Sequence, residues 1–169
     1  MVKVGLIGKG KWGKVIDKTI KDLSLSEDFF NINFVEPDQA DWVIISTPND
    51  LHYEQAMYWL GQGKNVFCEK PLTLTYESAI QLFEFADVMN RKLYVDDVFS
   101  WRDDYPIYDD TNYFVWTKPN QKDDNFVDRL AYHHFYMWVG DTDFEIKSIE
   151  GYSDDFKVEL EDGRTAMFK

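Results

Sequence analysis

The sequence predicts an α/β protein in which a Rossmann-type parallel-sheet domain is followed by a small, truncated α+β domain with an antiparallel sheet. Residues 2–7 form an apolar run that leads directly into a glycine motif, as a strand buried on both faces does. Apolar segments then alternate with segments of helical periodicity, the pattern of right-handed βαβ crossovers. After about residue 98 the chain becomes rich in Asp, Tyr and Pro and ends in a hairpin signal. We therefore expect two domains, residues 1–98 and residues 99–169.

The first domain is predicted to begin with a strand and an amphipathic helix. Residues 12–23 form that helix, because their apolar side chains recur at steps of three and four. The remaining elements are, in order, strands over 31–35 and 41–46, a helix over 50–60, a strand over 65–69, a helix over 76–90 and a strand over 92–95. Asn49 and Thr75 suit the N-caps of the two later helices, since their side-chain oxygens accept from free helix N–H groups.

The second domain is predicted to be smaller and mainly antiparallel. Its elements are a strand over 112–117, a helix over 124–138, a strand over 144–152 and a C-terminal hairpin. The hairpin is indicated by clean alternation over 156–160, a turn at Asp162-Gly163 and a returning strand over 164–168. Its short strands leave exposed sheet edges, which invite pairing with another chain. We therefore expect a homo-oligomer, a homodimer formed through this sheet.

Composition and charge exclude several classes of protein. Hydrophobic residues make up 44% of the chain, enough for a packed core. The net charge of −13 opposes binding to nucleic acids and to anionic membranes, so the expected partner is a small molecule. No apolar run could cross a bilayer and no signal peptide is recognisable, so we expect a cytoplasmic protein. The single cysteine, Cys68, excludes an intrachain disulfide and a cysteine zinc site, and we expect it to be a buried hydrophobe.

A G-x-G-x-x-G motif occupies residues 8–13, between a predicted strand and a predicted helix. In that context Gly8 allows the tight turn and Gly10 lets the backbone approach a diphosphate. Gly13 lets the helix pack closely on the strand. The motif predicts a dinucleotide site, although a glycine-rich turn without a ligand is the alternative.

The residues around this motif extend the predicted nucleotide site. Lys11 and Trp12 lie in the first helical turn, where free N–H groups attract phosphate, and Lys9 and Lys11 add positive charge. Glu36 follows the second strand, roughly the expected 20 residues beyond the motif. There it would accept from ribose hydroxyls and favour NAD over NADP, unless it is merely a solvated loop acid.

Two further segments carry a specific resemblance. They are residues 45–52, ISTPNDLH, and residues 68–72, CEKPL. Together with the glycine loop and at this spacing, they resemble the Gfo/Idh/MocA family of NAD(P)-dependent oxidoreductases, which includes sugar and inositol dehydrogenases. The resemblance covers roughly residues 2–98.

The resemblance implies roles for individual residues. It implies that the nicotinamide half of the cofactor lies against Ser46, Thr47, Pro48 and Asn49, with His52 close to the same groove. Glu69 and Lys70 would reach the nicotinamide ribose and the substrate. Lys70 would be the catalytic lysine, and the Lys70-Pro71 bond is typically cis in the family. The three loops all follow strand ends, so in an open parallel sheet they would face one crevice. A lysine desolvated there exchanges a proton with a hydroxyl, whereas the alternative is an exposed lysine at a strand end.

The sequence departs from the family pattern in two places. The segment between the first helix and Asp41 is too short for the strand, helix and strand that family members have there, which puts cofactor affinity in doubt. The C-terminal domain is also much reduced. Its nearest match to the family's catalytic helix offers His133, with His134 next to it, but the distance from Asp128 is one residue too long. The alternative is that both histidines flank an aromatic packing face.

These observations predict an NAD(P)-dependent oxidoreductase that transfers a hydride between nicotinamide and a hydroxyl-bearing substrate. The substrate would be a sugar, a polyol or a nucleotide sugar, with Lys70 and His133 moving the hydroxyl proton. A non-catalytic dinucleotide-binding or regulatory subunit that has lost most of its substrate domain is the alternative. A weaker alternative is a protein that keeps the fold without a cofactor.

Overall fold

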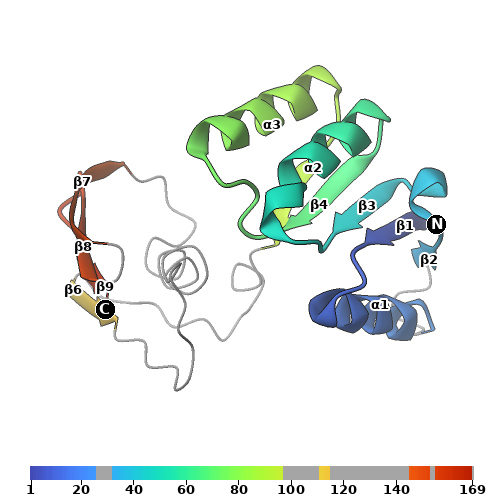
Figure 1. Ribbon diagram of the computed structural model, residues 1–169, viewed down its shortest axis with the longest axis horizontal. Coiled ribbons are helices and arrows are strands. Elements are labelled where there is room, and N and C mark those ends of the chain that lie inside the picture. Colours follow the sequence, from blue (N-terminus) through green and yellow to red (C-terminus); the bar gives the residue numbers. More distant parts are fainter. Residues whose placement is uncertain (26–31, 97–110, 115–144, 153–154, 169) are drawn as a thin grey trace. The chain divides into compact units, whose positions relative to one another are not determined.

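The computed structural model describes residues 1–25, 32–96, 111–114, 145–152 and 155–168 (Figure 1). The chain divides into two compact units, Met1–Asp96 and Asp97–Lys169, and each unit is described by itself. Within the described residues, no helix is long and apolar enough to cross a bilayer.

The first unit contains a five-stranded sheet in which every neighbouring pair is parallel. Its strands are β1 (Val2–Ile7), β2 (Ile32–Phe34), β3 (Trp42–Ile45), β4 (Asn65–Glu69) and β5 (Leu93–Asp96). The strand order β2-β1-β3-β4-β5 places β1 between β2 and β3. The chain therefore builds outward in two directions from β1, and a doubly wound sheet binds ligands at such a switch point. The predicted Rossmann-type sheet is confirmed.

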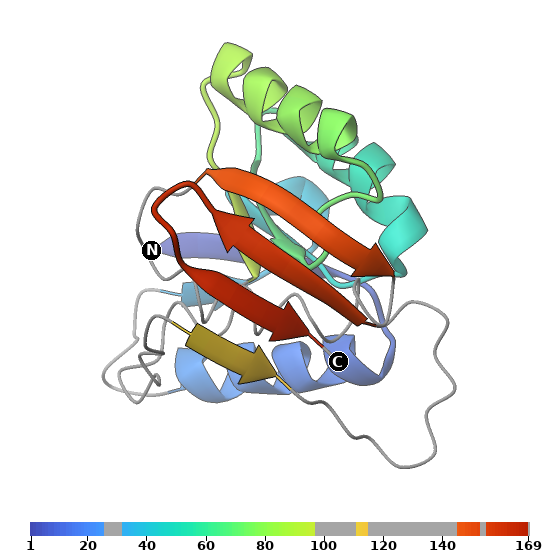
Figure 2. The same ribbon diagram turned by 90° about the vertical axis from the view of Figure 1, so that its left-hand side faces the viewer.

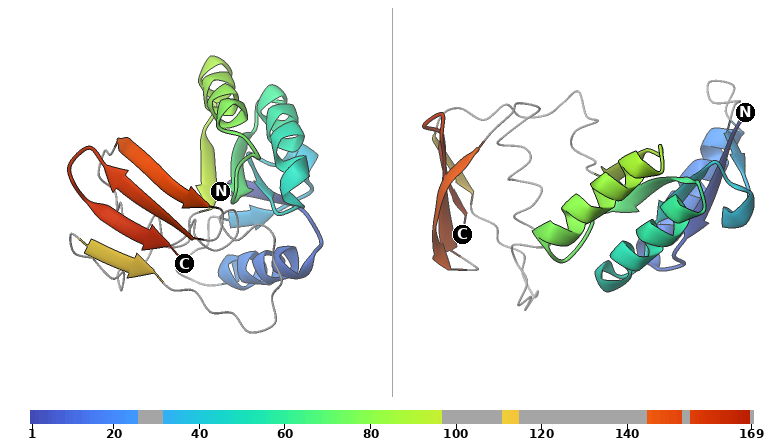
Figure 3. Two further views of the ribbon diagram at one scale, coloured as in Figure 1. Left: turned by 60° about the vertical axis from the view of Figure 1, so that its left-hand side comes forward. Right: turned by 90° about the horizontal axis from the view of Figure 1, so that it is seen from above.

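Helices cover both faces of this sheet. They are α1 (Lys11–Ser24), α2 (His52–Gly61) and α3 (Tyr76–Val88), with short 3-10 turns η2 (Pro37–Gln39) and η3 (Asn49–Leu51). Figures 1 and 2 show α1 on one face of the sheet and α2 with α3 on the other, and Figure 3 shows the latter two side by side. Thr75 caps α3 as predicted, because its hydroxyl accepts from the Ser78 backbone N–H at 3.2 Å.

The predicted cap at Asn49 is wrong. Asn49 opens the η3 turn, and α2 begins only at His52. The Leu51 N–H donates to the Pro48 carbonyl at 3.0 Å, so the chain enters the helix through a tighter turn. The sequence rule failed here because it assumes that the helix starts directly after the capping residue.

The core of this unit lies between the sheet and the pair α2 and α3. Alternate residues of β3, β4 and β5 are buried there, namely Val43, Ile45, Val66, Cys68 and Leu93. They pack with apolar side chains of the two helices, including Ala56, Leu60, Leu82 and Ala86. The residues between them are half-buried or exposed, so these strands are fully covered on one face. The prediction that residues 2–7 form a strand buried on both faces is wrong, because only Gly5 of β1 is fully buried. Cys68 is a buried hydrophobe as expected, and burial raises the pKa of its thiol.

The connection between β2 and β3 contains no α-helix, only the three-residue turn η2. Gly5 in the middle of β1 makes that turn possible. A Cβ at Gly5 would lie 2.7 Å from the Pro37 Cα and 3.2 Å from the Ala40 Cβ. The turn therefore packs directly on the backbone of β1, at a site where only glycine leaves enough room.

The second unit contains a four-stranded sheet with strand order β6-β9-β8-β7. Its strands are β6 (Thr111–Phe114), β7 (Ile146–Tyr152), β8 (Asp155–Leu160) and β9 (Thr165–Phe168). The three C-terminal strands are antiparallel, as predicted, and Figure 2 shows them face on. β6 joins the edge parallel to β9, so the complete sheet is mixed. The predicted helix over 124–138 lies outside the described residues.

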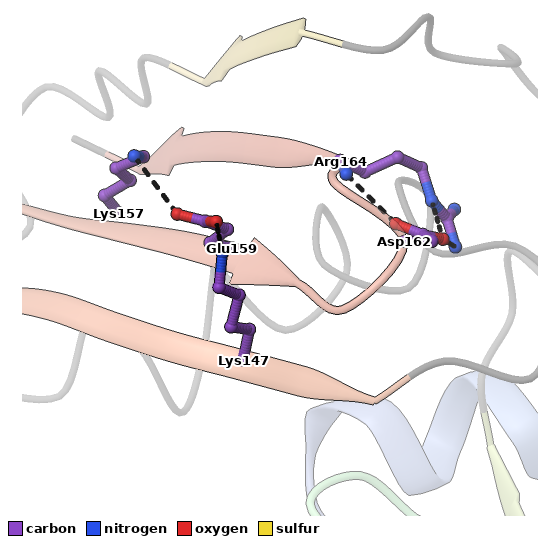
Figure 4. Close-up of polar contacts among 5 residues, drawn as sticks. All are labelled: Lys147, Lys157, Glu159, Asp162 and Arg164. Carbon is purple, nitrogen blue, oxygen red and sulfur yellow. Dashed lines mark hydrogen bonds and ion pairs between the residues drawn. The ribbon is translucent and has the colours of Figure 1, made fainter.

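The C-terminal hairpin has the predicted turn. Gly163 adopts a φ of +91°, and its N–H donates to the Leu160 carbonyl at 3.1 Å. One face of the hairpin is buried, through Val158, Leu160, Ala166 and Phe168. The turn and the other face of the hairpin carry ion pairs that join Lys147 and Lys157 to Glu159 and Arg164 to Asp162 (Figure 4). Such solvent-exposed pairs contribute little to stability.

Candidate functional site

Loops that follow β1, β3 and β4 meet in one place. They line a cavity of about 520 Å³ in the first unit. Its lining residues are Gly8, Lys9, Gly10, Lys11, Trp12, Ser46, Thr47, Pro48, Asn49, Glu69 and Lys70. The structure thus brings together the three loops that the sequence expected at one crevice, at the carboxyl ends of adjacent parallel strands.

The glycine loop fits against the neighbouring loop because it lacks side chains. Gly8 has a φ of +109°, and a Cβ there would lie 2.1 Å from the Ser46 carbonyl oxygen. A Cβ at Gly13 would lie 2.1 Å from the Gly8 carbonyl oxygen, so this glycine lets α1 pack against the loop. At Gly10, which lines the cavity, a Cβ would meet nothing within 4 Å. The space beside Gly10 is therefore open in the protein itself.

The N-terminus of α1 is suited to bind an anion. Gly10 is its N-cap residue, no side chain caps the helix and no acidic residue lies in its first turn. The positive end of the helix dipole, with its free N–H groups, thus carries no carboxylate of its own helix. Lys9 and Lys11 line the same cavity and add positive charge.

A second cavity, of about 320 Å³, shares Gly8 and Lys9 with the first. It is lined by Leu6, Gly8, Lys9, Gly13, Lys14, Asp17, Phe34, Val35, Glu36 and Pro37. Glu36 is thus brought to the glycine loop from the end of β2, as the sequence expected. The two cavities together form an extended site on both sides of the loop.

Glu69 is the most perturbed acid of the site. Trp12 donates its indole N–H to the Glu69 carboxylate, which joins α1 to the end of β4. Burial, followed by the hydrogen bond and the charge of Asp96, raises the pKa of Glu69 to about 7. The Trp12 hydrogen bond and the charge of Lys70 lower this pKa and only partly offset the increase. Glu69 thus changes its charge near neutral pH.

His52 is fully buried and lines neither cavity. Its Nδ1 lies 2.8 Å from the Pro71 carbonyl oxygen and its Nε2 lies 2.9 Å from the Thr47 carbonyl oxygen. The ring thus connects the backbone of the loop after β3 with the backbone of the loop after β4. It supports the shape of the site, whereas the resemblance implied a position at the groove.

Comparison with known proteins agrees with this geometry. The family profile described as "Oxidoreductase family, NAD-binding Rossmann fold" matches residues 21–97. Residues 21–97 are thus similar to the Gfo/Idh/MocA family of oxidoreductases. Two relatives are an uncharacterised oxidoreductase of Streptococcus pneumoniae, 30% identical over 105 residues, and the NADP⁺-linked scyllo-inositol 2-dehydrogenase of Bacillus subtilis, 30% identical over 126 residues.

These matches cover 50% and 62% of this chain but only 29% and 35% of the two relatives, so the chain spans about a third of their length. Among solved structures, the UDP-N-acetylglucosamine 3-dehydrogenase of Acidithiobacillus ferrooxidans superposes with a TM-score of 0.75 at 18% identity. That superposition covers 98% of this chain and 68% of the other chain, and it shows a shared fold.

The remaining expectations for this site concern Lys70 and the histidines. Lys70 is half-buried beside Glu69 in the cavity lining, and the Lys70-Pro71 bond is cis, as the resemblance implied. His133 and His134 lie outside the described residues.

Sequence reasoning missed Asp96, although it ends the strand next to β4 and is the register partner of Glu69. The rule that strand ends share one crevice, applied to β5, could have found it.

Proposed function

We propose that this chain binds NAD or NADP across its glycine loop and uses it to oxidise or reduce a hydroxyl-bearing substrate. The observation that carries the proposal is the pair of cavities that share Gly8 and Lys9, with open space beside Gly10 in the cavity of about 520 Å³. A dinucleotide has the same organisation, since a diphosphate joins two nucleoside halves.

The lining residues fit both halves of such a cofactor. Backbone N–H groups at the start of α1, with Lys9 and Lys11, would hold the diphosphate. The cavity beside Phe34 and Glu36 would take the adenosine half, and the Glu36 carboxylate would repel a 2′-phosphate and so favour NAD. The nicotinamide half would lie in the other cavity, against Ser46, Thr47, Pro48, Asn49 and Glu69.

The chemistry proposed for the chain itself is proton transfer. When bound, the nicotinamide supplies a hydride donor or acceptor. Lys70 lines the same cavity and exchanges a proton with the substrate hydroxyl, as the family resemblance implies. His133, or His134 beside it, would assist. The relatives include an inositol 2-dehydrogenase and a UDP-N-acetylglucosamine 3-dehydrogenase, which supports a polyol, sugar or nucleotide-sugar substrate.

A second candidate is a dinucleotide-binding or regulatory subunit without catalysis. The three-residue turn η2 between β2 and β3 favours it, because it leaves a reduced wall on the adenosine side. In either case we propose a homodimer through the second sheet, whose edge strands are β6 and β7, which sedimentation analysis can test.

Fluorescence titration with NADH and NADPH, followed by turnover assays on a panel of polyols, sugars and nucleotide sugars, tests the proposal. Lys70→Met should lower turnover at least about a hundredfold while nucleotide affinity stays measurable. Lys92→Met is the matched control, because Lys92 is exposed at the opposite end of β5 from Asp96. Unchanged turnover in Lys70→Met would contradict the catalytic role. Binding without turnover by the wild type would favour the second candidate, and no binding of either nucleotide would reject both.

A further inference from the structure

Two carboxyl groups meet beside the cavity. Glu69 ends β4 and Asp96 ends β5, and the two residues are register partners in the parallel sheet. Partners in register point to the same face of a sheet, which brings both side chains together. Two carboxylates side by side repel each other, so the charge of Asp96 favours a proton on Glu69. A carboxyl that holds the proton can donate it to the neighbouring carboxylate, so one proton can serve both groups.

The other groups around Glu69 oppose that proton. Trp12 donates to the Glu69 carboxylate from α1, and Lys70 follows Glu69 in the chain with its positive charge. Lys9 and Lys11 line the same cavity from the glycine loop. These donors and cations favour an ionised Glu69, whereas burial and Asp96 favour a protonated one. The pKa of Glu69 reaches about 7, so neither set dominates at neutral pH.

We propose that Asp96 is a positioning residue that shares a proton with Glu69 and so couples nucleotide binding to the release of one proton. The proposal rests on the proposed function, because it takes Glu69 as the acceptor for nucleotide hydroxyls. A nucleotide hydroxyl donates a stronger hydrogen bond to an ionised Glu69 than to a Glu69 that shares a proton with Asp96. Binding therefore selects the ionised form and expels the proton to solvent.

The consequence is a pH dependence with a defined sign. Above the pKa of Glu69 the free site is already ionised, so nucleotide affinity does not change with pH. Below it, each pH unit lowers the affinity by up to tenfold, because the proton must first be removed. In Asp96→Asn a neutral amide replaces the carboxyl and can donate to Glu69 at every pH. The pKa of Glu69 should then fall, and affinity should stay constant to lower pH.

The proton can be observed on the free protein, without nucleotide. Carbon-13 NMR of the full chain, labelled at the glutamate side-chain carboxyl, should show one glutamate with a midpoint near pH 7. That signal should disappear in Glu69→Gln, and its midpoint should drop by at least about one unit in Asp96→Asn. Asp87→Asn, an exposed acid on α3, is the control and should leave the midpoint unchanged. An unchanged midpoint in Asp96→Asn would overturn the proposal.

Nucleotide binding provides the second readout. NADH affinity of the wild type should fall close to tenfold between about pH 6.5 and pH 5.5, while Asp96→Asn and Glu69→Gln should change much less over that interval. Equal pH dependence in wild type and Asp96→Asn would overturn the coupling. Should neither nucleotide bind at any pH, the proposed function and the coupling both fail, whereas the free-protein titration still decides whether the two acids share a proton. Binding by a wild type whose NMR titration shows no such glutamate would leave the function intact and reject the shared proton.

Discussion

The two sides of the glycine loop are built in different ways. On the side of Thr47 and Lys70, hydrogen bonds to a buried residue hold the backbone, since His52 contacts the carbonyls of both neighbouring loops. The Thr47 hydroxyl also donates to Gln55 at 2.7 Å. On the side of Glu36, the wall consists of the three-residue strand β2 and the three-residue turn η2. The connection between β2 and β3 contains no α-helix.

The two sides of the site should therefore respond differently to substitution. A buried polar residue that is removed leaves its partners without hydrogen bonds, so the Thr47 side is sensitive to change in its interior. The Glu36 side depends on one close backbone contact, between η2 and Gly5. We therefore expect changes on the first side to affect stability most and changes on the second side to affect nucleotide choice.

His52→Ala should have the largest effect on stability. It leaves a cavity and two loop carbonyls without their partner, and we expect a loss of about 3 kcal/mol in the free energy of unfolding. Chemical denaturation measures it, with the exposed Lys92→Ala as a control that changes stability by less than about 0.5 kcal/mol. A loss below about 1 kcal/mol for His52→Ala would mean that the ring does not hold the two loops.

Gly5→Ala should have the next largest effect. The new Cβ would lie 2.7 Å from the Pro37 Cα, so η2 or β1 must shift, at a cost of about 1–3 kcal/mol. We expect NADH affinity to fall as well, because Pro37 lines the adenosine-side cavity. Denaturation and titration of the same variant test both effects. A variant with wild-type stability and affinity would contradict the role given to Gly5.

Glu36→Gln should have the smallest effect and should alter specificity alone. Removing the negative charge should improve the affinity for NADPH relative to NADH about fivefold, equivalent to roughly 1 kcal/mol of repulsion. Asp38→Asn is the matched control, because Asp38 is an exposed acid of η2 that does not line the cavity. If both variants shift the preference equally, general surface charge rather than Glu36 sets it.

Local patterns predicted the central part of this site, whereas contacts between distant residues were missed. Gly8, Gly10 and Gly13 could be assigned because each is required by a turn or close approach within one motif. Asp96 was missed although it ends a predicted strand, because its link to Glu69 depends on strand register. The parallel pairing of β6 with β9 was missed for the same reason. Gly5 was visible as a glycine inside a strand, but its partner Pro37 is brought to it only by folding.

The central claim is that the open space beside Gly10 receives the diphosphate of a dinucleotide. Gly10→Ala tests it most directly, because the added Cβ meets nothing within 4 Å in the free protein. We predict that this variant keeps its stability to within about 1 kcal/mol and loses NADH affinity at least about tenfold in a fluorescence titration. A Gly10→Ala protein that binds NADH as tightly as the wild type would contradict the account.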